Sequence, residues 1–314
     1  MLEILSITGV IFVLIGLGFG SVRLKVFSSA DMTVLGRLVV QFALPALIFR
    51  AVSTRTLAEI AVPGYLGAML LGSVAVFWSG FLWSRRISGQ NAGGSTFSAM
   101  GMSCANSGFV GYPVLLMALP EIATTALAMN MIVENLVMIP MGLAMAEASR
   151  SNGIEGTRLA RQIAARLARN PIVLALCAGV VVSVFHIPLP QIIFRPLDIL
   201  ANASAAVSLI VIGGTLAGLS LSSLTLSVAP VVIGKLLIHP AAVALSLILM
   251  ATLGLPVPEH LAAAAILMAA MPVMAIYPIL AQRYGEDQNA TLAMFLMTLL
   301  SFLTFSATLA LVLP

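Results

Sequence analysis

Residues 103–113 read SCANSGFVGYP and lie inside a long apolar segment of the chain. They bring two serines, an asparagine, two glycines and a proline together at a depth where a membrane helix normally holds apolar residues. Glycine tolerates non-helical backbone angles, and proline removes a helical hydrogen bond. We therefore expect the helix through this stretch to be broken near the middle of a membrane.

The composition of the chain is that of a membrane protein. Hydrophobic residues make up 61% and charged residues 8% of the 314 residues, and the mean hydropathy is +1.12. Such a chain cannot cover itself with polar surface in water. We predict an all-α polytopic membrane protein, whose first apolar run is a retained helix rather than a signal peptide. Its ten predicted spans lie near 2–22, 33–52, 62–83, 93–119, 122–148, 171–187, 196–218, 227–253, 259–282 and 288–312.

One predicted connection, residues 150–170, is long and basic. Leu159, Ile163 and Leu167 recur at helical spacing among arginines, a pattern typical of a helix on an anionic membrane surface. The alternative is that the arginines only set the orientation of the chain in the membrane and bind nothing. Alternating loops then place most positive residues on one side, which should be the cytoplasm. Both termini should lie outside, and the expected location is the cell membrane, the inner membrane in a bacterium. The cytoplasmic set is Arg23, Lys25, Arg85, Arg86, Arg150, Arg158, Arg161, Arg166, Arg169 and Arg283, against Arg50, Arg55 and Arg195 outside.

Two short motifs recur at one offset of 165 residues (277 − 112). Tyr112-Pro113 matches Tyr277-Pro278, and LAM at 127–129 matches LAM at 292–294. Transporters are commonly built from such repeats. Five helices in each half would force the second copy to enter the membrane inverted. We therefore expect one repeat over 1–149, the basic loop over 150–170, and an inverted repeat over 171–314.

The repeat mate of the opening stretch is AAMPVMAIYP at 269–278, which is equally unfit for an uninterrupted helix. Unwound backbone at membrane depth is tolerated only where protein buries it or a polar cavity borders it. We expect the two breaks to face each other at a binding site, where helix ends supply partial charges; proline kinks that only shape packing are the alternative. The candidate substrate-binding residues are Asn106, Ser107, Gly108, Tyr112, Pro113, Met271, Pro272 and Tyr277, with Gln41 and Asn202 as weaker candidates.

Ionisable side chains inside the predicted spans are few. Glu134 and Asn135 lie about halfway along the fifth span, where a carboxyl group implies a proton, a partner or an ion pathway. Lys235 either reaches the cytoplasmic interface or attracts an anion. We interpret these three residues as candidates for the coupling ion. His239 and His260 have no metal-binding spacing and suit packing or interface roles, and Cys104 and Cys177 suggest neither a metal nor a disulfide. No cofactor or metal is expected.

Six motifs carry a resemblance to a known family through their order and spacing. They are FALPALIF at 42–49, NSGFVGYP at 106–113, NPIVLALCAGVVVSVFHIPLP at 170–190, VIGGTLAG at 211–218, GKLLIHP at 234–240 and RYGEDQNATLA at 283–293. In these motifs the chain resembles the auxin efflux carrier family of secondary transporters, which includes plant auxin exporters and bacterial malonate or organic-acid permeases. The resemblance implies two inverted five-helix repeats, a fold similar to bile-acid transporters and sodium/proton antiporters, and broken helices four and nine that cross. It also implies an elevator mechanism, with scaffold and transport domains interleaved between the repeats.

The chain departs from the family at both crossovers. Plant members carry Asn-Pro at the first, whereas Asn106 is followed here by Ser107, and the second has Met271-Pro272. Asn106 remains the best match to a substrate-facing polar residue, and the departure argues against auxin itself as the substrate.

The sequence thus predicts a secondary transporter or facilitator of a small organic anion, auxin-like or a carboxylate. Its expected partners are that anion, a proton or sodium, and the lipid bilayer, without nucleic acid; a homodimer is one alternative for its assembly. A cation/proton antiporter and a sensor-like membrane protein are alternative functions. An intramembrane enzyme is disfavoured because the spans hold only one deep carboxylate and no acid/base or metal constellation.

Overall fold

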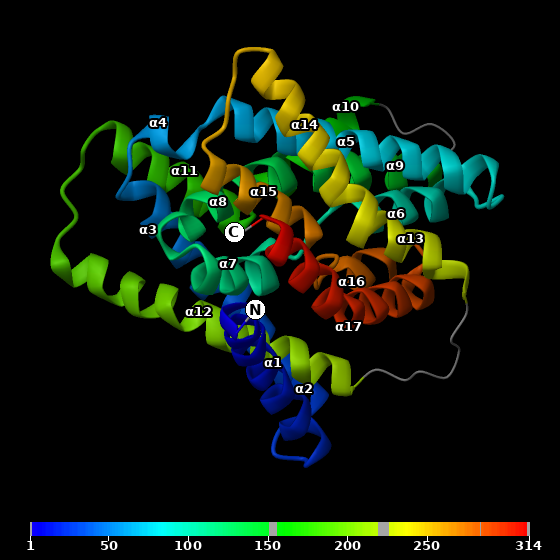
Figure 1. Cartoon of the computed structure of the whole chain (residues 1–314), viewed down its shortest axis with the longest axis horizontal. Coiled ribbons are helices and arrows are strands. Elements are labelled where there is room, and N and C mark those ends of the chain that lie inside the picture. The colour runs from blue at the N-terminus through cyan, green and yellow to red at the C-terminus, as the bar shows by residue number, and fades with distance from the viewer. Residues whose placement is uncertain (1, 151–155, 219–225, 283, 313–314) are drawn as a thin grey trace. The chain divides into compact units, whose positions relative to one another are not determined.

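The computed structural model describes residues 2–150, 156–218, 226–282 and 284–312, and all their regular elements are helices (Figure 1). Six helical stretches among them are long and apolar enough to cross a membrane, or seven if Arg161–Leu167 and Pro171–Val184, bent by 68°, form one span. This confirms an all-α polytopic membrane protein. The six stretches are Ser29–Ser53, Leu57–Arg86, Pro120–Ser149, Gln191–Ala217, Ala229–Thr252 and Asp287–Val312.

The other four predicted spans are not among these six stretches. The first is helix α1 (Leu2–Arg23), of which Gly9–Arg23 counts as a shorter apolar helix, and the sixth is α11 (Pro171–Val184). The fourth divides into α6 (Ala92–Ser103), the π-helix η2 (Ser107–Gly111) and α7 (Tyr112–Ala118), and the ninth into α15 (Glu259–Ala270) and α16 (Tyr277–Gln282). These are the two helices expected to break. The total of ten spans stays a prediction.

Contacts divide the chain into two compact units. Unit 1 comprises Met1–Val62, Ser107–Met131 and Arg169–Ser220, and unit 2 comprises Pro63–Asn106, Ile132–Ala168 and Leu221–Pro314. Each unit therefore takes segments from both halves of the sequence. The boundary between Asn106 and Ser107 falls at the break in the fourth predicted span.

Unit 1 is built around the long helix α12 (Gln191–Ala217). Helix α1 packs along it, and α2 (Ser29–Leu38), η1 (Val39–Ala43) and α3 (Leu44–Ser53) pack on α12 as well (Figure 1). Two glycines permit the close approach of α1 and α12. A Cβ atom at Gly213 would lie 1.8 Å from the Ile15 carbonyl oxygen, and one at Gly18 would lie 2.0 Å from that of Ile210. The short helix α4 (Leu57–Ile60) also belongs to unit 1, and so does most of α8 (Pro120–Val133).

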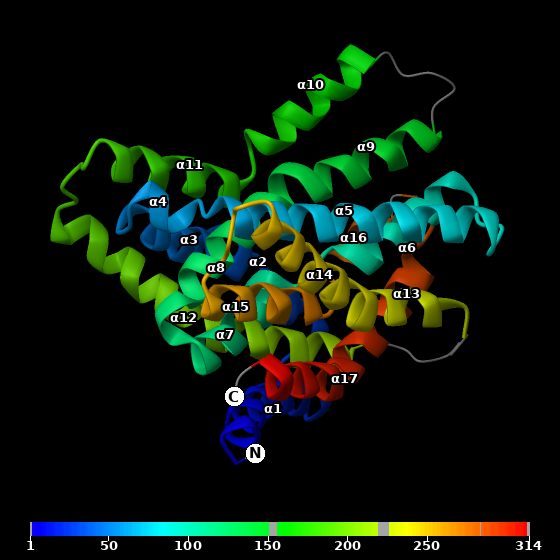
Figure 2. The same ribbon diagram turned by 45° about the horizontal axis from the view of Figure 1, so that its top comes forward.

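Unit 2 centres on α5 (Pro63–Arg86), which packs against both α6 and α14 (His239–Thr252) (Figure 2). A Cβ at Gly72 would lie 2.8 Å from a methyl group of Val243, so this glycine allows α5 and α14 to meet. Helix α14 continues from η4 (Leu226–Val228), α13 (Ala229–Ile233) and the π-helix η5 (Gly234–Ile238). This unit also contains the π-helix η3 (Glu134–Met138), the helix α9 (Ile139–Arg150) that follows it, and the long helix α17 (Asp287–Val312).

Capping residues explain where several helices begin. The Asn170 side chain accepts a hydrogen bond from the Ile172 N–H at 2.9 Å, and Pro171 occupies the first turn of α11. Within the basic loop, α10 (Gly156–Leu167) is the helix that the spacing of Leu159, Ile163 and Leu167 predicted. Its placement on a membrane surface stays a prediction, and the side chains of Arg150, Arg158 and Arg283 lie outside the described parts of the structure.

Candidate functional site

The two broken segments meet through their backbones. After α6 ends at Ser103, residues 104–106 are non-helical, and residues 271–276 are non-helical between α15 and α16. The backbone N–H of Asn106 donates a hydrogen bond to the carbonyl oxygen of Pro272 at 2.7 Å. Asn106, Met271 and Pro272 are all buried. Within unit 2, the structure therefore brings together these three predicted residues, which are far apart in sequence.

Side chains of opposite charge bind backbone groups that the two breaks leave without helical partners. The Glu134 carboxylate accepts a hydrogen bond from the backbone N–H of Ala105 at 2.9 Å. The Lys235 ammonium donates to the carbonyl oxygen of Ala269, in the last turn of α15, at 2.9 Å. Unsatisfied backbone groups at a helix end are costly in an apolar setting. Glu134 and Lys235 thus stabilise one break each.

Lys235 is held by a second buried group, His239, one helical turn further along. The Lys235 Nζ lies 2.7 Å from His239 Nδ1, and His239 Nε2 lies 2.9 Å from the Ser73 hydroxyl oxygen. With Lys235 as an ammonium donor, Nδ1 accepts and the Nε2–H donates to Ser73. Both side chains are fully buried. The spacing of four residues in the sequence was the signal that could have paired them.

Glu134 and Lys235, an acid and a base, are both buried within unit 2. Glu134 is 7% exposed and Lys235 is 0% exposed. Coulomb interactions are strongest where water is excluded. The acid and the base that the sequence predicted therefore lie in the same compact unit as His239, where opposite charges on them would attract each other.

Most of the predicted polar candidates lie in π-helical turns. Glu134 and Asn135 open η3, Lys235 is in η5, Ser107 opens η2, and Gln41 is in η1. A π-turn widens the helix and is found disproportionately at functional sites. The sequence showed the polar residues but not this backbone feature.

In unit 1, the chain after the first break is buried as well. Ser107 accepts a hydrogen bond from the side-chain amide of Asn130, and Asn130 is fully buried. The Asn130 side-chain oxygen has no hydrogen-bond partner among the described residues. Tyr112 and Pro113 are also buried at the start of α7. Sequence reasoning missed Asn130, although its position one turn before Glu134 could have pointed to it.

A Cβ atom at Gly108 would lie 2.8 Å from a methyl group of Leu44, so this glycine lets η2 approach α3 within unit 1. The weaker candidates Gln41 and Asn202 have exposed side chains. Asn202 accepts a hydrogen bond from Arg50 Nη1 at 2.9 Å, and the same nitrogen forms an ion pair with Asp198. Asn202 therefore belongs to a charged cluster that the sequence did not indicate.

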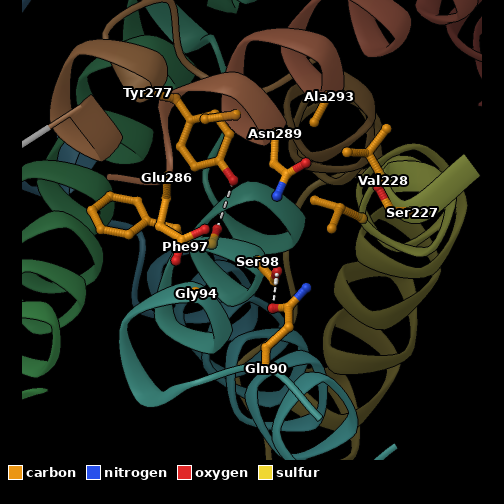
Figure 3. Close-up of a pocket in the computed structure, with 12 residues that line it drawn as sticks. Gln90, Gly94, Phe97, Ser98, Ser227, Val228, Tyr277, Glu286, Asn289 and Ala293 are labelled. Carbon is orange, nitrogen blue, oxygen red and sulfur yellow. Dashed lines mark hydrogen bonds between the residues drawn. The ribbon is translucent and has the colours of Figure 1, made fainter. Parts of the chain in front are cut away.

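A polar pocket in unit 2 lies beside Tyr277, as Figure 3 shows. Its volume is about 30 Å³, which is room for one or two water molecules. The Tyr277 hydroxyl donates to the Phe97 carbonyl oxygen at 2.8 Å, and Ser98 donates to the Gln90 side chain at 2.8 Å. Burial raises the pKa of Glu286, while a hydrogen bond with the Asn91 side chain opposes that shift. The lining residues are Gln90, Gly94, Phe97, Ser98, Ser227, Val228, Val231, Tyr277, Glu286, Asn289, Ala290 and Ala293.

The described side chains include no group of three His, Cys, Asp or Glu residues placed to hold a metal ion. Ionisable groups at the breaks, Glu134, Lys235 and His239, instead contact backbone and one another.

Comparison with known proteins agrees with this picture. A protein of Rhizobium meliloti (strain 1021), named "Putative malonate transporter", is 28% identical over 313 residues, which cover 99% of this chain and 97% of that protein. The family model described as "Membrane transport protein" matches residues 9–309. The chain therefore belongs to this family of membrane transport proteins, the auxin efflux carrier family, rather than to a family of enzymes.

Proposed function

We propose that the chain is a secondary transporter that moves a small organic anion, a mono- or dicarboxylate, across the membrane. The observation that carries the proposal is the junction of two broken helices at Asn106 and Pro272, with Glu134 and Lys235 bonded to the same two breaks. Family membership and the name of the Rhizobium relative support transport of such a solute.

The proposed binding region is the crossover of the two broken segments. Asn106 offers an amide there, and the buried Lys235 supplies positive charge in the same unit. A positive potential at a water-poor site favours an anion. Ser107, Tyr112, Pro113 and Tyr277 are the further proposed substrate-binding residues.

The proposed transport mechanism is an elevator movement between unit 1 and unit 2. Support comes from the division of the chain into two compact units whose boundary includes the Asn106–Ser107 bond. Each unit has its own helix packing, around α12 in unit 1 and around α5 in unit 2. Movement of one such body relative to the other is the step by which an elevator transporter carries its substrate from one side of the membrane to the other.

Ten spans in two inverted repeats remain the proposed architecture, with both termini outside and the bacterial inner membrane as the location. The bounds of the helices support the repeat at the offset of 165. Four helical stretches of the first half, moved along the chain by 165 residues, fall close to four stretches of the second half. The pairs are 29–53 with Gln191–Ala217, 57–86 with Ala229–Thr252, 92–103 with Glu259–Ala270, and 120–149 with Asp287–Val312. The charge distribution supports the orientation.

The proposed coupling ion is a proton or sodium, acting through Glu134 and Lys235, with Asn135 beside them. A proton on Glu134 would remove the negative charge that faces Lys235, and the ammonium would then be free to attract an anion. Binding of the proton and of the organic anion would thus support each other.

Purified protein in liposomes tests this function. Labelled mono- and dicarboxylates are offered while pH, sodium and voltage gradients are set separately. We expect saturable uptake that is driven by one ion gradient, and Asn106→Ala should reduce it. No saturable carboxylate movement in any gradient would refute the proposal.

A cation/proton antiporter is the second candidate, because the buried Glu134 and Lys235 could serve ions alone. The same liposomes distinguish it. An antiporter would move protons in response to a sodium gradient with no organic anion present, whereas the proposed transporter would show ion movement only together with the carboxylate.

A further inference from the structure

A charged cluster in unit 1 joins the predicted candidate Asn202 to two residues, Arg50 and Asp198, that the sequence did not indicate as binding residues. Arg50 lies in the last turn of α3, and Asp198 and Asn202 lie one turn apart on α12. The Arg50 Nη1 forms an ion pair with Asp198 and donates to the Asn202 side-chain oxygen at 2.9 Å. The Asn202 amide nitrogen lies 3.5 Å from the other Asp198 oxygen. The three side chains therefore bond to one another across two helices.

Only one nitrogen of the Arg50 guanidinium takes part in these contacts. Nη2 and Nε have no hydrogen-bond partner in the parts of the chain that the structure describes. The side chain is 20% exposed, compared with 43% for Asp198. A guanidinium carries five N–H donors in a planar fork that matches the two oxygens of a carboxylate. Arg50 thus retains the donors for a second carboxylate while Asp198 holds its position.

The cluster also reaches the chain that follows the first break. Helix α12, which carries Asp198 and Asn202, packs against η2 and α7 within unit 1. Tyr112, the first residue of α7, is a predicted substrate-binding residue. Among the described side chains, no second cation is hydrogen-bonded to the cluster.

We propose that Arg50 binds the carboxylate of the transported anion in unit 1, and that the Asp198 charge limits the affinity so that the anion can leave. The inference rests on the proposed function, and it names a residue that selects for carboxylates. An anion beside Arg50 is attracted by the guanidinium and repelled by Asp198. A transporter requires binding that is strong enough for entry and weak enough for release, a condition also met in channels.

The two partners of the ion pair should then have opposite effects when they are changed. Asp198→Asn keeps an acceptor for Nη1 but removes the repelling charge, so the KM for malonate should fall. Arg50→Gln removes the binding charge, so the KM should rise by roughly tenfold to a hundredfold. A purely structural ion pair would give changes in the same direction, through loss of stability.

The experiment measures KM and Vmax for labelled malonate in liposomes for the parent and four variants. Arg50→Lys is included in case Arg50→Gln fails to fold, since it keeps the charge but loses the planar fork, and an increase in KM is again expected. Arg55→Gln is the matched control. Arg55 is a half-buried arginine of the same unit that donates to the Glu121 backbone carbonyl at 3.0 Å, and its KM should match the parent's.

A second measurement does not depend on transport. Malonate should raise the apparent unfolding temperature of the purified parent protein, more so for Asp198→Asn and less so for Arg50→Gln. If Arg50→Gln and Asp198→Asn shift the KM in the same direction, or if Arg50→Lys binds malonate like the parent, the inference is overturned while carboxylate transport stands. A parent that neither transports nor binds any carboxylate would overturn the proposed function and this inference with it.

Discussion

Replacing Lys235 by methionine tests whether the ammonium is a charged partner of Glu134. Methionine has a similar length but no donor, so the Ala269 carbonyl and His239 Nδ1 would lose their contacts at 2.9 and 2.7 Å. His239 Nδ1 lies 3.2 Å from the Ala269 oxygen, so a change of tautomer would let the Nδ1–H donate to that carbonyl while Nε2 accepts from the Ser73 hydroxyl. The cost of losing the two Lys235 contacts should therefore be smaller than the about 1–3 kcal/mol that each unsatisfied buried group would cost. Removing a buried ammonium recovers several kcal/mol of desolvation. The balance therefore depends on whether Glu134 is left as an unpaired charge.

Glu134→Gln completes a double-mutant cycle. Glutamine keeps a side-chain oxygen that can accept from Ala105 N–H, but it has no charge. If Glu134 and Lys235 are paired ions, each single change leaves the other charge buried and should cost about 3–5 kcal/mol. The double variant Glu134→Gln/Lys235→Met has no buried charge in this pair, so its loss should be at least about 1 kcal/mol smaller than the sum of the single losses.

Unfolding by denaturing detergent provides the free energies, followed by the fluorescence of Trp78 and Trp83 in α5. Lys25→Met is the matched control, because Lys25 is exposed and its loss should change stability by less than about 0.5 kcal/mol. Strictly additive losses in the double variant would refute the pairing. A stable Glu134→Gln protein whose carboxylate accumulation no longer depends on pH would instead identify Glu134 as a proton carrier.

Single contacts lead to the remaining predictions. Asn106→Ala keeps the backbone bond to Pro272 and should lower carboxylate uptake; parent-like uptake would show that transport does not need the amide. Gly213→Ala should destabilise unit 1 by about 1–3 kcal/mol or more, because its Cβ would lie 1.8 Å from the Ile15 carbonyl oxygen. Thermal unfolding measures this loss, and Gly16→Ala is the control, because a Cβ at Gly16 would have no atom within 4 Å. Because burial raises the pKa of Glu286, its contribution to stability should be complete below the unfolded-state pKa and be lost as pH rises through the folded-state pKa. Glu286→Gln should abolish that decline in a series of unfolding temperatures from about pH 4 to 8, and an unchanged decline would contradict the assignment.

Local sequence predicted the interruptions of the helices well. Glycine and proline act within a few residues of their own position, so SCANSGFVGYP and AAMPVMAIYP indicated breaks that the structure places at 104–106 and 271–276. Apolar length predicted the six long membrane-spanning stretches for the same reason. These properties need no knowledge of what packs against a segment.

Partners that lie far apart in the chain could not be predicted in this way. Glu134 bonds to the backbone 29 residues earlier, Lys235 to a carbonyl 34 residues later, and Arg50 to Asp198 across 148 residues. In the sequence, Arg50 counted only as a loop charge that sets orientation. The fold alone decides that it meets a carboxylate on α12.

Glu134 links the proposed coupling ion to the proposed binding region over a very short path. Its carboxylate accepts from the N–H of Ala105, and the next residue, Asn106, is bonded to Pro272. A hydrogen bond to an ionised acceptor is roughly twice as strong as one to a neutral acceptor. Protonation of Glu134 would therefore weaken its hold on the first break and, at the same time, remove the charge opposite Lys235 at the second. One proton would in this way alter both broken segments, because each is stabilised by one member of the same charged pair.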